Sequence, residues 1–447
     1  MAEHDDNSLP PTSRFHRFRK LAGLTAQLGS EALGQGVRRF AGKDVELLSR
    51  ETAEKLVATL GDLKGAAMKF GQIASMDPDL VSPELRVVLS RLQNQAPPMS
   101  YATVAKVVEA ELQAPPEQLF ATFDQEPMAA ASLGQVHRAT LSNGRKVVVK
   151  VQYPGVDRGL KGDLENLGGV VKALSFTGKT LDGTAYFREL SEQLIHELDY
   201  VREAQRVQAF ASAVAPIEAL VVPEVIPERS AQKVLTLEYL EGPTLQQWLQ
   251  TEPDAAARLR VSRQLVLATF GPFFTARQVH GDPHPGNYLV LPGGRLGVLD
   301  FGSVRAFPPE PVELVRKLVV ALGSGTSLDL VALARAAGFT VDMPQDEGQA
   351  FLARLAELST RPLQVDHYDF AQDQMAKDTR DFMARNVGRA LKVRPPADSI
   401  FFFRALGGLG QNLKSVGASG NFQSIVPELL ALPELSPSSS RTSETSI

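Results

Sequence analysis

The 447-residue chain carries 47 Lys and Arg against 51 Asp and Glu, for a formal net charge of −4. This balance argues against a nucleic-acid partner, because proteins that bind the phosphate backbone present excess positive charge. The chain has no cysteine, which excludes disulfides, thiolate metal sites and cysteine nucleophiles. Its length leaves room for two or three compact units.

The N-terminal region contains a basic amphipathic segment. Residues 1–12 are polar with two prolines, and we expect them to be disordered. Ser13–Phe40 then places apolar residues at helical spacing beside a cluster of Arg and Lys. Such a helix can lie on an anionic membrane surface or dock on the protein's own core, and we favour the second interpretation.

Neither end of the chain shows a membrane or export signal. No apolar run is long enough to span a bilayer, and the first residues lack the features of a signal peptide. We therefore expect a cytoplasmic protein, whose membrane contact would be peripheral, at the inner face of the membrane, through the N-terminal helix.

Helical periodicity dominates the next stretch. From Glu46 to Met76, apolar residues recur every three or four positions, which predicts one long helix or two. Lys69 and Gln72 lie three residues apart in this segment and so share a helix face, although such a pair alone is usually just solvated. Two further helices, Pro83–Gln93 and Tyr101–Glu111, each end before a pair of prolines.

The period then changes to that of strands. Met128–Arg138 and Lys146–Gln152 flank a Ser-Asn-Gly turn, which predicts a hairpin. Alternation along the second strand places Val148 and Lys150 on one face. The loop Ala129–Gly134 lies across this hairpin from Lys150, as in kinase-type sites that cover and clamp phosphates. An edge hairpin with a surface lysine would show the same pattern.

Residues 186–210 predict one long helix. Tyr200 and Glu203 share one face with His196, whereas Glu197 lies about a third of a turn away. The two glutamates should therefore have different partners. We expect Glu203 to form the ion pair with Lys150 that phosphate clamping requires.

Two more strands precede a candidate hinge. The second of them, Lys233–Leu240, is followed by Gly242 and Pro243, which fits a linker between two lobes. The backbone of Glu238 and Leu240 would bind an adenine ring there. Beyond Thr244 the chain is predicted to be helical apart from one hairpin, with helices at Leu245–Leu249, Ala255–Arg277, Pro311–Leu322, Leu328–Ala337, Glu347–Leu358, about Phe370–Leu391 and Ser399–Val416.

The one hairpin in this region carries a constellation of polar residues. Two short apolar runs flank the turn Pro292–Gly294. Asp282 and Asn287 precede the hairpin and Asp300, in D-F-G, follows it, so all three side chains should lie at one end. Phosphoryl transfer needs one carboxylate at the attacking oxygen, plus an amide oxygen and a second carboxylate for the metal ions. This predicts that Asp282 orients the nucleophile, that Asn287 and Asp300 bind Mg²⁺, and that His280 braces the loop.

Together these motifs resemble the UbiB-type (AarF-like) atypical kinases, a family associated with ubiquinone and other isoprenoid-lipid metabolism. The resemblance extends from about Leu56 to Leu413. It rests on K-x-G-Q at Lys69–Gln72, the alanine-rich loop Ala129, Ala130, Ala131 and Ser132, the strand lysine Lys150, E-x-D at Glu197–Asp199, the helix glutamate Glu203, the catalytic loop Asp282–Asn287 and the metal aspartate Asp300.

The resemblance implies an α+β, two-lobed protein-kinase-like fold with an added N-terminal helical K-x-G-Q module and a mostly helical C-lobe. Its parts would be a disordered start and basic helix, the K-x-G-Q module, an N-lobe with a helical insert, the C-lobe and a disordered tail. These correspond to residues 1–45, 46–120, 121–241, 242–435 and 436–447.

The resemblance also implies ligands and their residues. ATP and Mg²⁺ would be the cofactors, and a lipid or quinone-related small molecule the further partner. The nucleotide would contact the alanine-rich loop, Val148, Lys150, Glu238 and Leu240. Lys69, Gln72 and Glu197 would gate the site, with Lys69 meeting Glu197. Val148 departs from the alanine that kinases often carry on the adenine side, and Asn94 from an aspartate usual in the family.

Three functions therefore stay open. The first is a Mg²⁺-dependent, ATP-using kinase or ATPase that supports quinone or lipid metabolism. The second is a nucleotide-regulated, lipid-binding scaffold with little turnover. The third is a small-molecule phosphotransferase of the aminoglycoside or choline kinase type, since H-G-D-x-H-x-G-N occurs in both groups. The K-x-G-Q and E-x-D motifs favour the first over the third.

Overall fold

The computed structural model describes residues 99–131, 133–157, 197–324, 326–396 and 398–435, with the single positions 160, 164, 191 and 195. The predicted segments 1–45 and 436–447, residues 46–98 of the helical K-x-G-Q module, and Ser132 lie outside these residues. The chain divides into two compact units. The first comprises the described residues up to Gly144, those of Val148–Tyr200, and Ala231–Val234; the second comprises Arg145–Val147, Val201–Ser230 and the chain from Leu235 onward.

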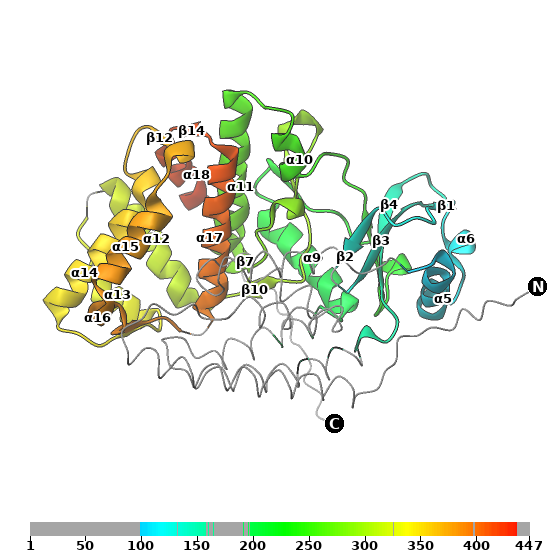
Figure 1. Cartoon of the computed structure of the whole chain (residues 1–447), viewed down its shortest axis with the longest axis horizontal. Helices are drawn as coiled ribbons and strands as arrows, with labels where there is room; N and C mark the ends of the chain where they lie inside the picture. Colours follow the sequence, from blue (N-terminus) through cyan, green and yellow to red (C-terminus); the bar gives the residue numbers. More distant parts are fainter. Residues whose placement is uncertain are drawn as a thin grey trace, which may run out of the picture. The chain divides into compact units, whose positions relative to one another are not determined.

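The described part of the first unit begins with two short helices (Figure 1). Helix α5 (Tyr101–Leu112) starts at Ser100, whose hydroxyl accepts the Thr103 N–H, and buries Val104 and Val108 completely. Helix α6 (Pro116–Leu119) follows, with proline at its first position. Helix α5 confirms the helix predicted over these residues.

A five-stranded sheet carries the candidate phosphate-clamping lysine. Its order is β1-β3-β4-β6, and β2 pairs with β3. The strands are β1 (Thr122–Phe123), β2 (Ala129–Ala131), β3 (Gly134–Thr140), β4 (Lys146–Gln152) and β6 (Val234–Glu238). Along β4, Val147, Val149 and Val151 are completely buried while Lys146 is exposed, which confirms the predicted alternation. A Cβ at Gly134 would overlap the carbonyl oxygen of Val151, so only glycine permits this close approach of backbones.

The alanine-rich segment differs from the prediction. Ala129–Ala131 is a short strand rather than a loop, antiparallel to β3 in the register Ala129↔Val136 and Ala131↔Gly134. Only three residues are paired, and the chain reverses directly afterwards. The small side chains of Ala129 and Ala130 are exposed along this strand.

The prediction of one long helix over residues 186–210 is also wrong in part. Helix α9 begins at Tyr200 and runs to Val214, and Glu197 and Leu198 lie in a turn before it. The Leu198 N–H donates to the Ile195 carbonyl, and the Leu198 carbonyl accepts the side-chain amide of Gln152 at 3.0 Å. Because a strand side chain takes this carbonyl, the backbone leaves the helical path. Glu197 and Glu203 therefore do not share one helix.

The second unit contains the predicted hairpin. Strands β8 (Tyr288–Val290) and β9 (Leu296–Val298) pair antiparallel in the register Tyr288↔Val298, as expected. The parallel strand β5 (Leu220–Val221), which comes from far upstream, completes a three-stranded sheet. Strand β7 (Gln278–His280) pairs with β10 (Val304–Ala306), so the segments just before the catalytic loop and just after D-F-G are neighbours.

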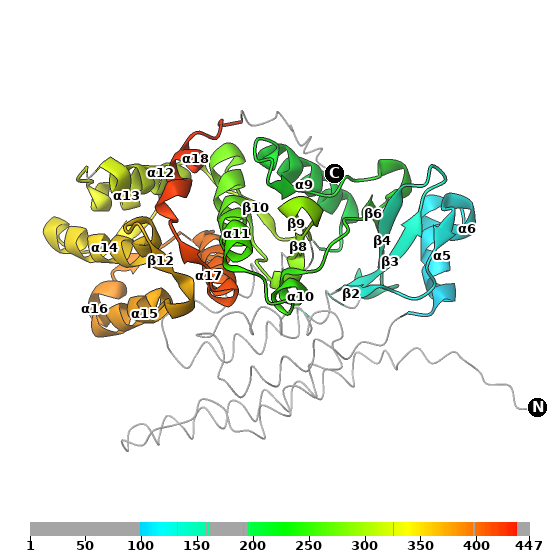
Figure 2. The same ribbon diagram turned by 90° about the horizontal axis from the view of Figure 1, so that it is seen from above.

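Two long helices of the second unit lie side by side: α11 (Ala255–Ala276) and α17 (Ser399–Val416) (Figures 1 and 2). Asp254 caps α11 by accepting the Ala257 N–H at 2.7 Å. The rings of Phe273 and Phe402 stack between the two helices with 4.9 Å between centroids. This apolar contact fixes α17 against the body of the unit.

The remaining helices are mostly short. They are α10 (Leu245–Leu249), α12 (Pro309–Ser324), α13 (Leu330–Ala336), α14 (Gln345–Ser359), α15 (Met375–Arg385), α16 (Val387–Ala390) and α18 (Val426–Leu430). Two small ladders, β11 (Thr340–Val341) with β13 (Val393–Arg394) and β12 (Tyr368–Asp369) with β14 (Ser419–Gly420), join loops between them. No helix among the described residues is long and apolar enough to cross a membrane.

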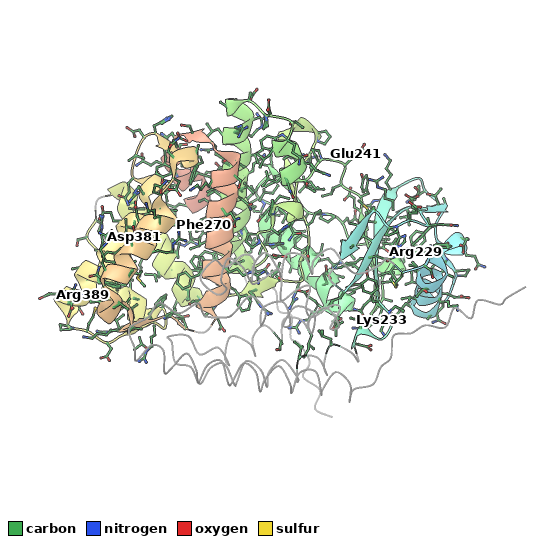
Figure 3. All side chains as sticks on the ribbon, viewed as in Figure 1. Arg229, Lys233, Glu241, Phe270, Asp381 and Arg389 are labelled. Atoms are coloured by element: carbon green, nitrogen blue, oxygen red, sulfur yellow. The ribbon has the colours of Figure 1, made fainter. Side chains whose placement is uncertain are left out.

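The helix predicted over Phe370–Leu391 is divided in the structure. The Asp373 carboxylate accepts the Tyr368 hydroxyl and the Met375 N–H, and thus turns the chain before α15. Helices α13 and α14 pack together around a core that includes Val331. Arg389 of α16, labelled in Figure 3, pairs with Glu347 of α14 at 2.7 Å.

Candidate functional site

His280 connects the catalytic loop to the D-F-G segment. Its Nε2 lies 2.9 Å from the Leu299 carbonyl oxygen, and the Asp282 N–H donates to its Nδ1 at 3.4 Å. The two bonds together require the neutral tautomer that carries its proton on Nε2. The ring is buried and meets Phe210 and Phe301 edge-on. His280 therefore braces the loop as the sequence predicted.

Asn287 and Asp282 form a hydrogen-bonded pair. The Asn287 Nδ2 donates to the Asp282 backbone carbonyl at 3.0 Å and to its Oδ2 at 3.2 Å. The Asn287 carbonyl accepts the Leu299 N–H, so the hairpin register holds this residue beside the D-F-G segment. Because the amide nitrogen faces Asp282, the amide oxygen of Asn287 is directed away from that carboxylate.

Asp300 has an unusual backbone conformation. Its φ is 59°, in the left-handed region that residues other than glycine seldom adopt. Its Oδ1 accepts the Gly302 N–H at 3.3 Å, which offsets part of the cost. Asp300 directly follows Leu299, the residue opposite Asn287. Residues held in such sparsely populated conformations cluster at functional sites.

Helix α17 packs one face against the catalytic loop. The Arg404 Nη2 lies 3.3 Å from the Asp282 Oδ1, and both side chains are largely buried. The Asn412 Nδ2 donates to the Pro283 carbonyl at 2.8 Å, and a Cβ at Gly408 would overlap the Pro283 ring. Positions 404, 408 and 412 are four apart and share a face. The reasoning from sequence missed all three, although their spacing beside a Gly-Gly pair in a helix was the available signal.

Tyr288 is buried and interacts electrostatically with Asp282. Burial, followed by the negative charge of Asp282, raises the pKa of the Tyr288 hydroxyl. Tyr288 therefore contributes an uncharged side chain to the surroundings of Asp282.

The first unit holds Lys150. Its Nζ lies 4.9 Å above the centroid of the Tyr200 ring, a cation–π contact, and Val148 is half-buried on the same strand face. Lys150 belongs to the first unit and Glu203, which is buried, to the second. Their ion pair stays a prediction, as does contact of the nucleotide with the alanine-rich segment.

The candidate hinge residues have defined backbone partners. The Glu238 N–H donates to the Glu224 carbonyl at 2.8 Å, and the Tyr239 N–H donates to the Lys146 carbonyl at 3.1 Å. An adenine ring at Glu238 would therefore meet its carbonyl rather than its N–H. The Leu240 side chain packs against Gly297 of the β8–β9 sheet. The adenine-binding roles of Glu238 and Leu240 stay predictions.

The predicted gate is described at one residue only. Glu197 is buried in the turn before α9. Lys69 and Gln72 lie outside the described residues, so the pair of Lys69 with Glu197 stays a prediction.

The donor set fits a magnesium ion that arrives with a nucleotide. Among the described residues, no group of three or more His, Cys, Asp or Glu side chains could hold a metal by itself. Mg²⁺ is usually held by one or two carboxylates together with substrate phosphates and water. Asn287 and Asp300, one amide and one carboxylate at the end of the same hairpin, match that requirement.

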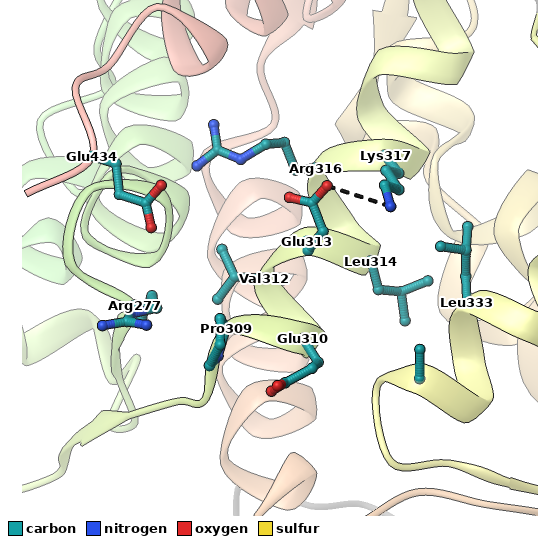
Figure 4. A pocket seen from close by; sticks show the side chains of 11 residues that line it. Arg277, Pro309, Glu310, Val312, Glu313, Leu314, Arg316, Lys317, Leu333 and Glu434 are labelled. Carbon is teal, nitrogen blue, oxygen red and sulfur yellow. Dashed lines mark ion pairs between the residues drawn. The ribbon is translucent and has the colours of Figure 1, made fainter.

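A separate hollow of about 400 Å³ lies along α12 (Figure 4). Acidic and basic side chains line it together, among them Glu313 and Lys317, which pair at 3.5 Å. None of the residues discussed above lines this hollow, and its mixed charges neutralise one another. It is not the phosphate site.

The sheet with its strand lysine, the helical second unit and the braced Asp–Asn loop beside D-F-G are the features of a protein-kinase-like phosphotransferase fold. Comparison with known proteins agrees with this class. Residues 91–332 match the family model described as the ABC1 atypical kinase-like domain. The chain belongs to this family, the UbiB- or AarF-type atypical kinases.

Relatives from several lineages support the assignment. "Atypical kinase COQ8, mitochondrial" of Saccharomyces cerevisiae is 30% identical over 454 residues, which cover 95% of this chain and 86% of the yeast protein. "Atypical kinase COQ8B, mitochondrial" of Danio rerio is 31% identical over 67% of this chain and 49% of the zebrafish protein. Among solved structures, "The complex structure of Rv3197-erythromycin from Mycobacterium tuberculosis" is similar, with 30% identity, a TM-score of 0.60, and coverage of 86% of this chain and 96% of that one.

Proposed function

We propose that the chain is an ATP-binding, Mg²⁺-dependent UbiB-type atypical kinase or ATPase that supports quinone or lipid metabolism. The observation that carries the proposal is a group of linked hydrogen bonds. Asn287 donates to Asp282, and His280 bonds the carbonyl of Leu299, the residue that precedes Asp300. Family membership supports the kinase-like class.

Each residue of the set has a defined task in this proposal. Asp282 orients the attacking hydroxyl or water, and the amide oxygen of Asn287 and the carboxylate of Asp300 hold the metal. Bound Mg²⁺ would neutralise charge on the phosphates. Lys150 and Glu203 position those phosphates.

The remaining ligand and location are part of the same proposal. The acceptor or effector would be a lipid or quinone-related small molecule. The protein would reside in the cytoplasm, and any membrane contact would be peripheral, at the inner membrane face through residues 13–40. The yeast and zebrafish relatives are named as mitochondrial proteins.

The test is nucleotide binding and ATP hydrolysis by the purified full chain, with and without Mg²⁺ and anionic liposomes. We expect Asp300→Asn to lose Mg²⁺-dependent binding. Asp282→Asn should still bind nucleotide but lose turnover by about 100-fold or more. Asp254→Asn is the matched control, because asparagine caps a helix as well as aspartate and Asp254 caps α11 rather than belonging to the proposed site. Absence of nucleotide binding by the wild type would refute the proposal.

One observation favours the scaffold function as a second candidate. Both carboxylate oxygens of Asp282 are engaged, Oδ1 by Arg404 and Oδ2 by Asn287. An acceptor hydroxyl would have to share these oxygens with the two donors, which favours slow turnover. If Asp282→Asn binds nucleotide and still complements a deletion strain, the scaffold function is preferred.

The small-molecule phosphotransferase is tested in the same preparation. The similar mycobacterial structure is a complex of Rv3197 with erythromycin, which makes this macrolide a reasonable compound to try. Incubation of the purified chain with ATP and erythromycin, an aminoglycoside or choline, followed by mass spectrometry, would detect a phosphorylated product. Such a product would replace the lipid-directed proposal.

A further inference from the structure

Helix α9 is tied directly to the D-F-G segment. The Arg206 Nη1 donates to the Gly302 carbonyl oxygen at 2.6 Å, across 96 positions of sequence. Hydrogen bonds from a charged donor are shorter and stronger than neutral ones. This bond is therefore a substantial restraint on the Gly302 peptide.

A second contact lies one turn further along the same helix. The Phe210 ring meets the Phe301 ring with 5.2 Å between centroids, and both are completely buried. Because Arg206 and Phe210 are four residues apart, they lie on the same face of α9. Helix α9 thus holds both residues that follow Asp300, one through its ring and the other through its backbone.

The Gly302 residue is restrained at both ends. Its carbonyl accepts from Arg206, and its N–H donates to the Asp300 Oδ1 at 3.3 Å. Asp300 itself has a φ of 59°, which is costly unless the surroundings support it. Fixing Gly302 fixes the N–H donor that orients the Asp300 carboxylate.

We propose that Arg206 is a positioning residue for the metal-binding carboxylate of Asp300, and that α9 sets the affinity of the site for Mg²⁺ through it. The inference rests on the proposed function, in which Asp300 holds the metal. Glu203 lies one turn before Arg206 on the same helix. A displacement of α9 would therefore change the metal site together with the residue proposed to position the phosphates.

The test compares Arg206→Gln and Arg206→Met with the wild-type full chain. The glutamine keeps polarity, and the methionine keeps the apolar stem while removing the donors. The measured quantity is the Mg²⁺ concentration that half-saturates the binding of a fluorescent ATP analogue, together with the Mg²⁺-dependent rise in Tm. Groups that orient metal ligands typically change metal affinity 10- to 100-fold, so we expect about a tenfold or larger increase in that concentration, with Mg²⁺-free nucleotide binding changed by less than about twofold.

Arg258→Gln is the matched control. Arg258 also donates to a backbone carbonyl at 2.6 Å, that of Val416, but lies on α11. Its loss should leave the Mg²⁺ dependence unchanged. Arg206→Lys, which keeps a cationic donor, should restore part of the affinity.

Two results separate the possible failures. If the wild type shows no Mg²⁺-dependent nucleotide binding, the proposed function itself fails. If the wild type binds and both Arg206→Gln and Arg206→Met show the wild-type Mg²⁺ dependence, the proposed function stands and the role of Arg206 is refuted.

Discussion

Gly408 brings α17 into close contact with the catalytic loop. A Cβ built there would overlap the Pro283 Cγ and lie 2.6 Å from the Pro283 Cβ. Pro283 directly follows Asp282, and its closed ring cannot rotate out of the way. Gly408→Ala should therefore push the loop and α17 apart.

The size of the effect follows from two opposing contributions. Overpacking of this kind costs about 1–3 kcal/mol, while replacing glycine by alanine inside a helix gains up to about 1 kcal/mol. The adjacent Gly407 is exposed, and a Cβ there meets no atom within 4 Å. Gly407→Ala should therefore show only the stabilisation that alanine gives inside a helix. Gly408→Ala should thus be less stable than Gly407→Ala by about 1–3 kcal/mol.

Urea unfolding gives the difference, provided that the two variants have the same m value. Steady-state ATP hydrolysis gives the functional consequence, because a shift of about 1 Å in a catalytic group can lower the rate by about 100-fold. If Gly408→Ala matches Gly407→Ala in both stability and turnover, the packing of α17 against the catalytic loop is not as described.

Three further predictions concern buried polar groups. Arg404→Met should lower the free energy of unfolding by up to about 3 kcal/mol, because it leaves the buried Asp282 charge without this partner. The double variant with Asp282→Asn should recover part of the loss. Equal urea midpoints for wild type and Arg404→Met would contradict this prediction. His280→Phe keeps an aromatic ring but leaves the Leu299 carbonyl without its donor. The free energy of unfolding in the same assay should therefore fall by about 1–3 kcal/mol. A variant as stable as the wild type would show that the bond contributes nothing. Burial lowers the pKa of His137 below its ordinary value, so the unfolded chain takes up the proton first and stability should decrease as pH falls below about 6.5. His137→Gln should show a smaller decrease between pH 7 and pH 5, and an unchanged pH profile would rule out this group as the cause.

Much of the local structure could be predicted from the chain alone. The helix Leu245–Leu249, the helix Ser399–Val416 and the β8–β9 hairpin agree closely with the predicted positions. In each case the apolar period and a bounding turn or capping residue act on the same short segment. Such signals depend only on neighbours in sequence.

The errors have a common physical cause. Helix α9 begins late because the side chain of Gln152, from a distant strand, takes the Leu198 carbonyl. The predicted helix Phe370–Leu391 is divided because the Asp373 side chain takes the Met375 N–H. Helical periodicity continued through both places, so the pattern of apolar residues could not reveal these hydrogen bonds.

The candidate site shows the same contrast between local features, which could be predicted, and long-range contacts, which could not. The order Asp282, Asn287, Asp300 around a hairpin was sufficient to place three groups at one end of a small sheet, since hairpin register is a local property. Arg404, which donates to Asp282, and Arg206, which donates to Gly302 beside Asp300, come from helices 122 and 96 positions away from the residues that they contact. Nothing in the spacing of Arg206 distinguishes it from a solvated residue, and the four-residue spacing of Arg404 with Gly408 and Asn412 marks a helix face without identifying what that face contacts.

The sequence by itself indicated the kinase-like class through its resemblance to a known family, and it predicted most local elements and a candidate set of phosphate-site groups, because motifs and short-range periodicity can be recognised in the order of the residues. Only the tertiary structure decided which helices hold those groups, which conformation Asp300 adopts and which oxygens of Asp282 are engaged. Those features depend on contacts between residues far apart in the chain, and a single sequence carries no direct record of such contacts.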